Sequence, residues 1–321
     1  MHSNRKGDVM LKYVLKRLGY ILVTLWVIVT CTFFMMKNLP GTPFDAERFS
    51  IMTPQQQERV LEMYGLNDSL PMQYVKYIKN MLKGDLCTSF TYVNQDVSKV
   101  ITGRLGPSAL IGIQAVLIGL AIGLILGILA AWKHNSGIDY FTMILAVLGV
   151  SVPNFVAAAL LQYYIGLKWG VLPVGFWTGW NCSVLPSIAL SFSATAMVAR
   201  FMRTEMLDVL DQDYIVTARA KGLSQMKVLM RHAVRNSILP VVTILGPIVV
   251  NLMTGSLAVE NIFSIPGIGS LFVDCIKAND YPVIMGITIF YAAFYMLIVL
   301  LVDLAYSLID PRIRLAKGKE S

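Results

Sequence analysis

Charged residues are scarce in this 321-residue chain, at 14 % of the sequence, while hydrophobic residues make up 56 %. Soluble domains carry about 25 % charged and about 45–50 % apolar residues. The shortage of charge therefore excludes an ordinary soluble domain and predicts an integral membrane protein. A membrane bundle of this length needs no large soluble core.

Motifs for nucleotide and metal chemistry are missing as well. No GxxxxGK(S/T) phosphate-binding loop occurs, and the single Gly-Lys pair, Gly318-Lys319, is followed by glutamate. CxxC and HExxH are absent, and His2, His134 and His232 lie far apart in the sequence. Because such motifs hold phosphate or metal, the chain by itself is predicted to be neither an ATPase nor a metalloenzyme. We expect no catalytic, cofactor or metal site in it.

Long apolar stretches are what the chain has instead. The first follows Lys12, Lys16 and Arg17 as a signal peptide would, but its length and the absence of a small-x-small cleavage site in MMKNLPG predict a retained anchor. Six stretches are long enough, or nearly so, to cross about 30 Å of hydrocarbon. They are 20–36, 108–132, 140–167, 185–199 (continuing in less apolar form to 207), 239–259 and 283–309.

Basic residues predict the orientation of these spans. Five Lys or Arg precede the first span, seven lie between Arg200 and Arg235, and four follow the last span, whereas the short external loops hold only Lys168 and Lys277. Because cytoplasmic loops carry the excess of Lys and Arg, both termini are predicted to be cytoplasmic. The net charge of +8 then mostly reflects topology, and no nucleic-acid partner is expected.

The cores of the spans contain no Asp, Glu, Lys, Arg or His. Ion-coupled transporters usually keep an ionisable group near the midplane, because so costly a charge is retained only for function. Its absence argues against a secondary transporter and indicates that energy for transport comes from elsewhere. The polar candidates in the spans favour interhelical hydrogen bonds over substrate binding; they are Gln114, Asn154, Gln162 and Asn251, while Asp139, Glu260 and Asp303 lie at span ends.

The basic segment between the fourth and fifth spans has a helix, elbow, helix pattern. Asp213 is a candidate cap for a short helix through YIVTARAK, Gly222 a left-handed terminator, and Ser224 a cap for a second helix. Pro240 is predicted to mark the turn into the membrane. One apolar stripe at helical spacing is expected on the second helix, beside a basic rim of Lys227, Arg231 and Arg235; the stripe is Met226, Leu229, Met230, Ala233 and Val234.

Two interpretations of this segment are open from the residues alone. An amphipathic basic helix can lie on anionic lipid. The glycine elbow and the two methionines instead favour the groove of a partner protein, because methionine adapts to a partner surface.

The segment TARAKGLSQMKVLMRHAVRNSILP also resembles the cytoplasmic coupling motif of ABC-transporter permeases, which has the form E-A-A, three residues, Gly, then a spaced I-x-L-P. Ala218, Gly222 and the Ile238–Pro240 ending match, whereas Val216 and Thr217 replace the Glu and the first Ala. That replacement is usual in the dipeptide, oligopeptide and nickel branch. NLPGTPF, GLNDSLPMQYVKYIKNMLKGDL, SVPNFVAAAL, VENIFSIPGIGSLFVDCIKANDYPVIMG and LIDPRIR resemble the same branch, so the likeness runs from about Met10 to Leu315 and is nearest to the first membrane subunit of oligopeptide permeases.

The resemblance implies a type I importer permease: an all-α membrane protein with six transmembrane helices and a small extracytoplasmic helical insert. Residues 1–36 would form the cytoplasmic N-terminus and first span, 37–106 the insert, 107–309 the core with a coupling loop at 208–237, and 310–321 a cytoplasmic tail. The implied partners are a homologous second permease, two ATP-binding subunits that hold ATP and Mg, an extracytoplasmic peptide-binding protein, the peptide and the lipid bilayer.

Site residues are implied in the same way. Those expected to couple to the ATPases are Thr217, Ala218, Ala220, Gly222, Met226, Leu229, Met230, His232, Asn236, Leu239 and Pro240. The P-G-I-G run would contribute to an outer gate facing the binding protein, with an ordinary loop as the alternative; its candidate residues are Glu260, Pro266, Gly267 and Gly269. Cys87 and Cys182 both fall in external loops, where free thiols are expected and a disulfide is the alternative.

The function predicted is that of a non-catalytic permease subunit of an ATP-driven oligopeptide importer. The alternatives are a permease for dipeptides, nickel chelates or other small solutes, and, from another class, a self-sufficient channel or secondary transporter.

Overall fold

The computed structural model describes residues 2–38, 49, 51–63, 65–92, 94–254 and 256–309, without the side chains of 2–15, 63, 253, 254, 256 and 303–309. Within that part of the chain there is no β-strand, and one isolated bridge joins Thr88 and Asp96. The chain forms two compact units, 1–106 with 270–296 and 107–269 with 297–321. Each is described by itself below; the expected tail at 310–321 lies outside the described residues.

Five helical segments are long and apolar enough to cross a membrane by length and composition. They are Lys16–Lys37, Val97–Trp132, Trp180–Leu210, Gln225–Leu252 and Tyr281–Val302. A sixth span exists if the bent pair Gly137–Ser151 and Asn154–Lys168 is counted as one. The six stretches recognised in the sequence therefore all recur as helices, and one of them is broken.

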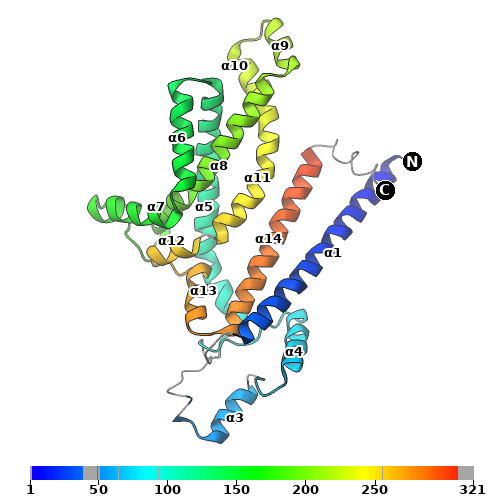
Figure 1. Ribbon diagram of the computed structural model, residues 1–321, viewed down its shortest axis with the longest axis vertical. Coiled ribbons are helices and arrows are strands. Elements are labelled where there is room, and N and C mark those ends of the chain that lie inside the picture. Colours follow the sequence, from blue (N-terminus) through cyan, green and yellow to red (C-terminus); the bar gives the residue numbers. More distant parts are fainter. Residues whose placement is uncertain are drawn as a thin grey trace. The chain divides into compact units, whose positions relative to one another are not determined.

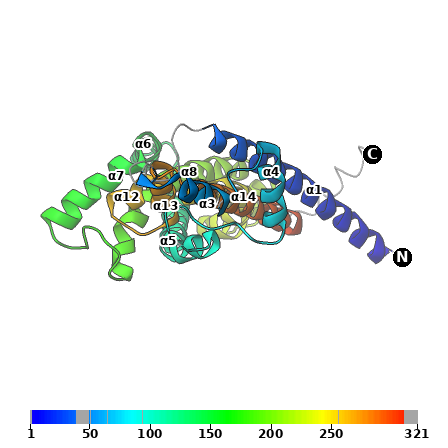
Figure 2. The same cartoon turned by 90° about the horizontal axis from the view of Figure 1, so that it is seen from below.

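The broken stretch corrects the expectation of one continuous span over 140–167. Helix α6 (Gly137–Ser151) ends before Pro153, and α7 (Asn154–Leu161), which continues as a π-helix to Lys168, leaves it at 101°. Proline has no N–H to donate and disfavours helical backbone in the residue before it. Val152 accordingly has φ −82° and ψ 118°. In Figures 1 and 2, the segment after the bend points sideways from α6, and α7 itself contacts α8 and α12.

Helix α8 (Val184–Leu210) is the most buried of the candidate spans and forms the centre of the second unit. Helix α5 (Val97–Trp132) approaches it through Gly119, Gly123 and Gly127. A Cβ added to these glycines would lie 2.7 Å from Ala194 Cβ, 2.7 Å from Val198 Cβ and 2.6 Å from the Ala199 carbonyl oxygen. The two backbones therefore touch, as small residues at four-residue spacing allow in membrane helices.

The coupling segment follows α8 as α9 (Asp213–Ala220), α10 (Gln225–Val228) and a π-helix over Leu229–Val234. The π-helix continues into α11 (Arg235–Thr254), which contains Pro240 and Pro247. The turn expected at Pro240 is therefore wrong, because the chain is helical on both sides of that residue. The remaining helices are α12 (Ser256–Ile262), α13 (Ile268–Lys277) and α14 (Tyr281–Ile309).

The first unit joins the segment between the first two spans to the end of α1 (His2–Lys37) and the start of α14. Its helices α3 (Pro54–Met63) and α4 (Leu70–Leu82) lie within the helical insert that the resemblance implies at 37–106. Thr53 caps α3: its Oγ1 accepts from Gln56 N at 3.4 Å, and Gln56 Oε1 accepts from Thr53 N at 2.9 Å. A core cluster then packs α4 onto α1 and α14; it consists of Val29, Phe33, Tyr77 and Met285.

Candidate coupling site

The α9–α10 elbow has the backbone that its sequence predicts. Gly222 has φ +76°, a left-handed conformation that a residue with a Cβ rarely adopts. Ser224 has extended backbone and is the residue before α10, although its side chain makes no capping hydrogen bond. Asp213 is the first residue of α9 and not its cap, a position held by Gln212. Its charge still favours the helix, because it lies at the positive end of the helix dipole.

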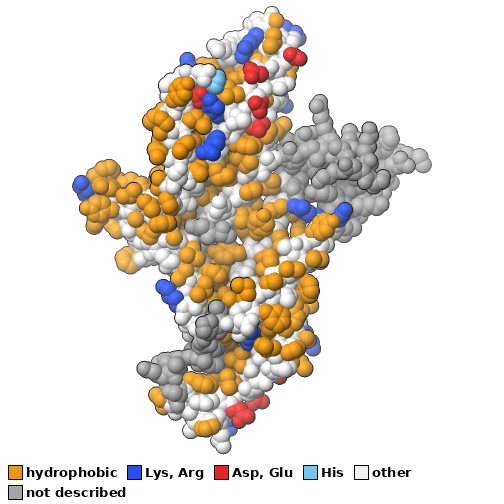
Figure 3. All heavy atoms as spheres, viewed as in Figure 1, with side chains coloured by type: hydrophobic (Ala, Val, Ile, Leu, Met, Phe, Trp, Pro, Cys, Tyr) orange, Lys and Arg blue, Asp and Glu red, His pale blue; other side chains and the backbone are white. Residues whose placement is uncertain are grey.

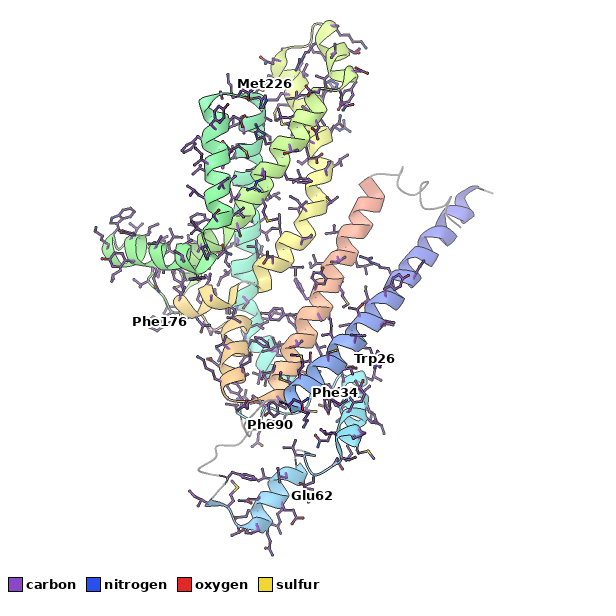
Figure 4. The ribbon with its side chains drawn as sticks, in the orientation of Figure 1. Trp26, Phe34, Glu62, Phe90, Phe176 and Met226 are labelled. Carbon is purple, nitrogen blue, oxygen red and sulfur yellow. The ribbon has the colours of Figure 1, made fainter. Side chains whose placement is uncertain are left out.

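The single apolar stripe expected on the second helix is wrong. Leu229 and Ala233 are buried in the core of their own unit, at 4 % and 0 % exposure, whereas Met226 and Met230 are 51 % and 54 % exposed. Val228 is buried as well, at 2 % exposure, so the side of this helix that carries Val228, Leu229 and Ala233 faces the core. Two methionines therefore remain available to a partner, and Leu229 does not. Figure 4 labels Met226 at the end of the unit that carries α10.

Contacts between α9, α10 and α8 hold the elbow in place. Ile215, Ala218 and Val228 form a small buried cluster. Val209 and Leu210, at the end of α8, pack against this cluster and also against the main core. The coupling segment is thus continuous in packing with the bundle.

Hydrogen bonds join the same segment to the start of α11. Asn236 Nδ2 donates to Tyr214 Oη at 2.9 Å. The buried Ser237 hydroxyl donates to the Glu205 and Ala233 carbonyls at 3.2 and 2.9 Å. The other implied coupling residues lie on or near the surface: Thr217, Ala220 and Leu239 are exposed, and His232 and Pro240 are half-buried. In Figure 3, basic and acidic side chains gather at this end of the unit.

An ion pair between α6 and α8 was not predicted from the sequence. Arg203 donates from Nε to Asp139 Oδ1 at 2.5 Å and from Nη2 to Asp139 Oδ2 at 2.7 Å. The Asp139 carboxylate is buried, and it also accepts from Asn135 N at 3.0 Å and lies 3.2 Å from His134 Nδ1. One signal was present in the sequence: Asp139 directly precedes the third predicted span and Arg203 lies in the less apolar continuation of the fourth, so opposite charges stand at the ends of two spans.

The candidate gate residues do come together. Ser108 Oγ on α5 donates to Glu260 Oε1 at 2.7 Å and accepts from Ile268 N at 2.8 Å. Glu260 is fully buried. A Cβ on Gly267 would lie 2.3 Å from Glu260 Oε2, and one on Gly269 would lie 2.7 Å from Leu257 Cα. The glycines of the Pro266–Gly269 loop are therefore required for close packing over the carboxylate, and Ser108 is a part of this site that the sequence did not suggest.

Two of the polar side chains in the spans bind other parts of the same unit. Gln162 Nε2 donates to the carbonyls of Val174 and Ile262 at 2.8 and 2.7 Å. Ser187 Oγ donates to Gln114 Oε1 at 2.9 Å. Both glutamines thus make the intramolecular bonds expected of them.

Cys87 and Cys182 are free thiols in the structure and belong to different compact units. Cys182 is buried, with its Sγ 3.4 Å from Thr178 Oγ1, so the thiol is enclosed by its own loop. Burial and the neighbouring Asp85 raise the pKa of the Cys87 thiol. That shift keeps Cys87 protonated and slow to oxidise.

Comparison with known proteins identifies the class. The model of the family "binding-protein-dependent transport system inner membrane component" matches residues 123–315, and the model of its N-terminal region matches 10–102. The chain belongs to this family and is a multi-pass membrane protein.

Curated relatives fall within one branch of that family. The chain is 46 % identical to the dipeptide transport system permease protein DppB of Lactococcus lactis, over 95 % of this chain and 100 % of the relative. It is 43 % identical to DppB of Bacillus subtilis, over 96 % and 99 %, and 39 % identical to the oligopeptide transport system permease protein OppB of Salmonella typhimurium, over 95 % and 100 %. The resemblance to peptide ABC-transporter permeases is thereby confirmed.

A solved structure supports the fold. The crystal structure of an amino acid ABC transporter with histidines matches with a TM-score of 0.51 at 20 % identity, covering 67 % of this chain and 94 % of that one. The all-α type I permease fold expected from the sequence is thereby confirmed.

Proposed function

We propose that this chain is the permease subunit of an ATP-driven peptide importer, forming half of the translocation pathway beside a homologous second permease. The observation that carries the proposal is the α9–Gly222–α10 segment. It packs on the end of α8, continues without a break into α11, and exposes Met226 and Met230. A partner that moves this segment necessarily moves two spans.

The partner proposed for this segment is an ATP-binding subunit. The exposed apolar face of the segment consists of Val216, Met226 and Met230, and we name it the joint face. Methionine side chains adapt to a groove, and the surrounding Arg219, Lys221, Lys227 and Arg231 are exposed. Two such subunits would hold ATP and Mg, so that this chain acts as a non-catalytic part of the importer.

The substrate proposed is a short peptide delivered by an extracytoplasmic binding protein. The relatives named for dipeptides have the higher identities, 46 and 43 %, and the relative named for oligopeptides has 39 %. Oligopeptides remain the substrate implied by the sequence blocks, and dipeptides are the second candidate. The Glu260 loop is proposed as the part of the outer gate that faces the binding protein.

Both termini are proposed to be cytoplasmic. This places Ser69, before α4, outside and Ser224, in the elbow, inside; both are exposed. In a cysteine-free background, a cysteine at position 69 should react with a membrane-impermeant thiol reagent in intact cells, and one at position 224 should react only after lysis. Equal labelling would overturn the orientation.

One experiment tests the function as a whole. The chain is purified with its co-purifying subunits, reconstituted in liposomes with the binding protein, and supplied with labelled dipeptides, tripeptides and pentapeptides. We expect uptake that requires ATP, and the preferred length distinguishes the two substrate candidates. Uptake or ion conduction by the chain alone, without ATPase subunits, would instead identify a secondary transporter or channel.

A further inference from the structure

The ion pair of Asp139 and Arg203 occupies a particular place in the second unit. Asp139 is in the first turn of α6, directly after the turn that joins α5 to α6. Arg203 is on α8, seven residues before its last residue, Leu210, which is about two helical turns. The pair therefore ties the α5–α6 hairpin to α8 close to the coupling segment.

The geometry of the pair is that of a rigid connection. Two hydrogen bonds join the guanidinium and the carboxylate, at 2.5 and 2.7 Å, and this fork fixes orientation as well as distance. The backbone N–H of Asn135 and the ring of His134 bind the same carboxylate from the hairpin turn. Arg203 Nη2 also lies 3.2 Å from His134 Nδ1. The turn, α6 and α8 are thus held at one point.

Packing connects this point to the coupling segment. Val209 and Leu210 contact the Ile215–Ala218–Val228 cluster of the elbow on one side and the main core on the other. Met202 and Met206, on the same helix as Arg203, are fully buried in that core. A displacement of α9 and α10 is thus carried to the end of α8 by packed side chains, and Arg203 is the polar contact from α8 to α6.

We propose that Asp139 and Arg203 are positioning residues for coupling, which make α6 and α8 move as one body when the ATPases move the α9–α10 segment. The proposal rests on the proposed function. A buried ion pair is a poor device for stability alone, because desolvation of both charges offsets their attraction. Its value here is the fixed geometry between two helices.

The test uses conservative variants of the complete importer in liposomes. Arg203→Lys keeps the charge and loses the two-bond fork, and Asp139→Asn keeps the size and loses the charge. Arg200→Lys is the matched control, because Arg200 is an exposed arginine on the same helix. The readouts are peptides taken up per ATP hydrolysed and the melting temperature of the detergent-solubilised complex.

We expect each variant of the pair to lower uptake per ATP at least threefold, with ATP hydrolysis and complex assembly retained and Arg200→Lys unchanged. The double variant should be no worse than the singles, because the two residues act as a unit. Replacement of both by apolar residues, Asp139→Leu with Arg203→Met, should keep the melting temperature and still lower uptake per ATP.

Three results would overturn the proposal. They are wild-type uptake per ATP in both single variants, an uptake loss that only follows a lower melting temperature, and normal uptake per ATP in the apolar pair. The wild-type measurement distinguishes failure of this proposal from failure of the proposed function. If wild-type uptake does not depend on ATP, the proposed function is wrong. If uptake depends on ATP in the wild type and uptake per ATP is the same in the variants, only the proposal about Asp139 and Arg203 is wrong.

Discussion

Gly222 offers a perturbation of the coupling elbow that leaves the packing untouched. Its φ of +76° is left-handed, and a Cβ added there would meet nothing within 4 Å. Substitution therefore introduces backbone strain with no steric clash. Two hydrogen bonds depend on this backbone, Gly222 N to Arg219 O at 3.0 Å and Leu223 N to Ala218 O at 3.4 Å.

The expected magnitude follows from this conformation. A left-handed residue with a Cβ is destabilised by about 1–2 kcal/mol, and a β-branched residue is an outlier there. Asparagine tolerates the conformation better and occurs naturally after helix ends. Because Gly222→Val alters only an exposed elbow, the amount of the variant chain in the membrane and its pairing with the second permease should be normal. The angle between α9 and α10 changes, and with it the position of the joint face.

The assay is ATP-dependent peptide uptake for Gly222→Asn, Gly222→Ala and Gly222→Val. Uptake should fall in that order and be largely lost for valine, with ATPases released more easily in detergent or hydrolysing ATP without response to peptide. Gly170→Val is the matched control, because Gly170 has φ +63° and open space around an added Cβ but lies far from the elbow in sequence. Wild-type uptake in Gly222→Val, or equal loss in Gly170→Val, would refute the reasoning.

Three further predictions concern packing. Leu229→Ala should lower the free energy of unfolding by about 2–5 kcal/mol in thermal melts, because Leu229 is buried. Met226→Ala should leave the melting temperature unchanged and weaken retention of the ATPase subunits. The reverse pattern would contradict the assignment of faces. Ser108→Ala removes a donor from the buried Glu260 carboxylate and should destabilise by about 1–3 kcal/mol, seen as faster proteolysis of the loop before α13. Gly123→Leu should lower the melting temperature sharply, because its Cβ alone would lie 2.7 Å from α8; an unchanged melt would show that the helices separate freely.

Much of the coupling segment was predictable because its signals are local. Gly222 after a short helix indicates a left-handed residue whatever surrounds it, since only the local backbone is involved. The spans were predictable from the length and composition of the apolar stretches, because the thickness of the bilayer sets the length that a spanning helix needs.

The prediction of which residues of the second helix share a face was wrong. Helical spacing places Met226, Leu229 and Met230 on one stripe, but only the Leu229 edge of that stripe packs against the core. The bend at Pro153 was readable from the proline, yet hydropathy alone runs through it, so the stretch was taken as one span. Periodicity does not show how a helix is rotated against its neighbours, and hydropathy does not register a bend at a proline.

The sequence by itself determined the class of protein, its helices and the elbow. Composition and the length of the apolar stretches indicate the class and the helices, and the backbone preference of Gly222 indicates the elbow; none of these depends on contacts between distant residues. Only the tertiary structure decided that Leu229 faces inward, that Ser108 binds Glu260 across 152 positions, and that Arg203 binds Asp139 across 64. These are contacts between helices far apart in the chain. Which residues meet depends on how the helices rotate and pack, and no local signal in one helix specifies the rotation of another.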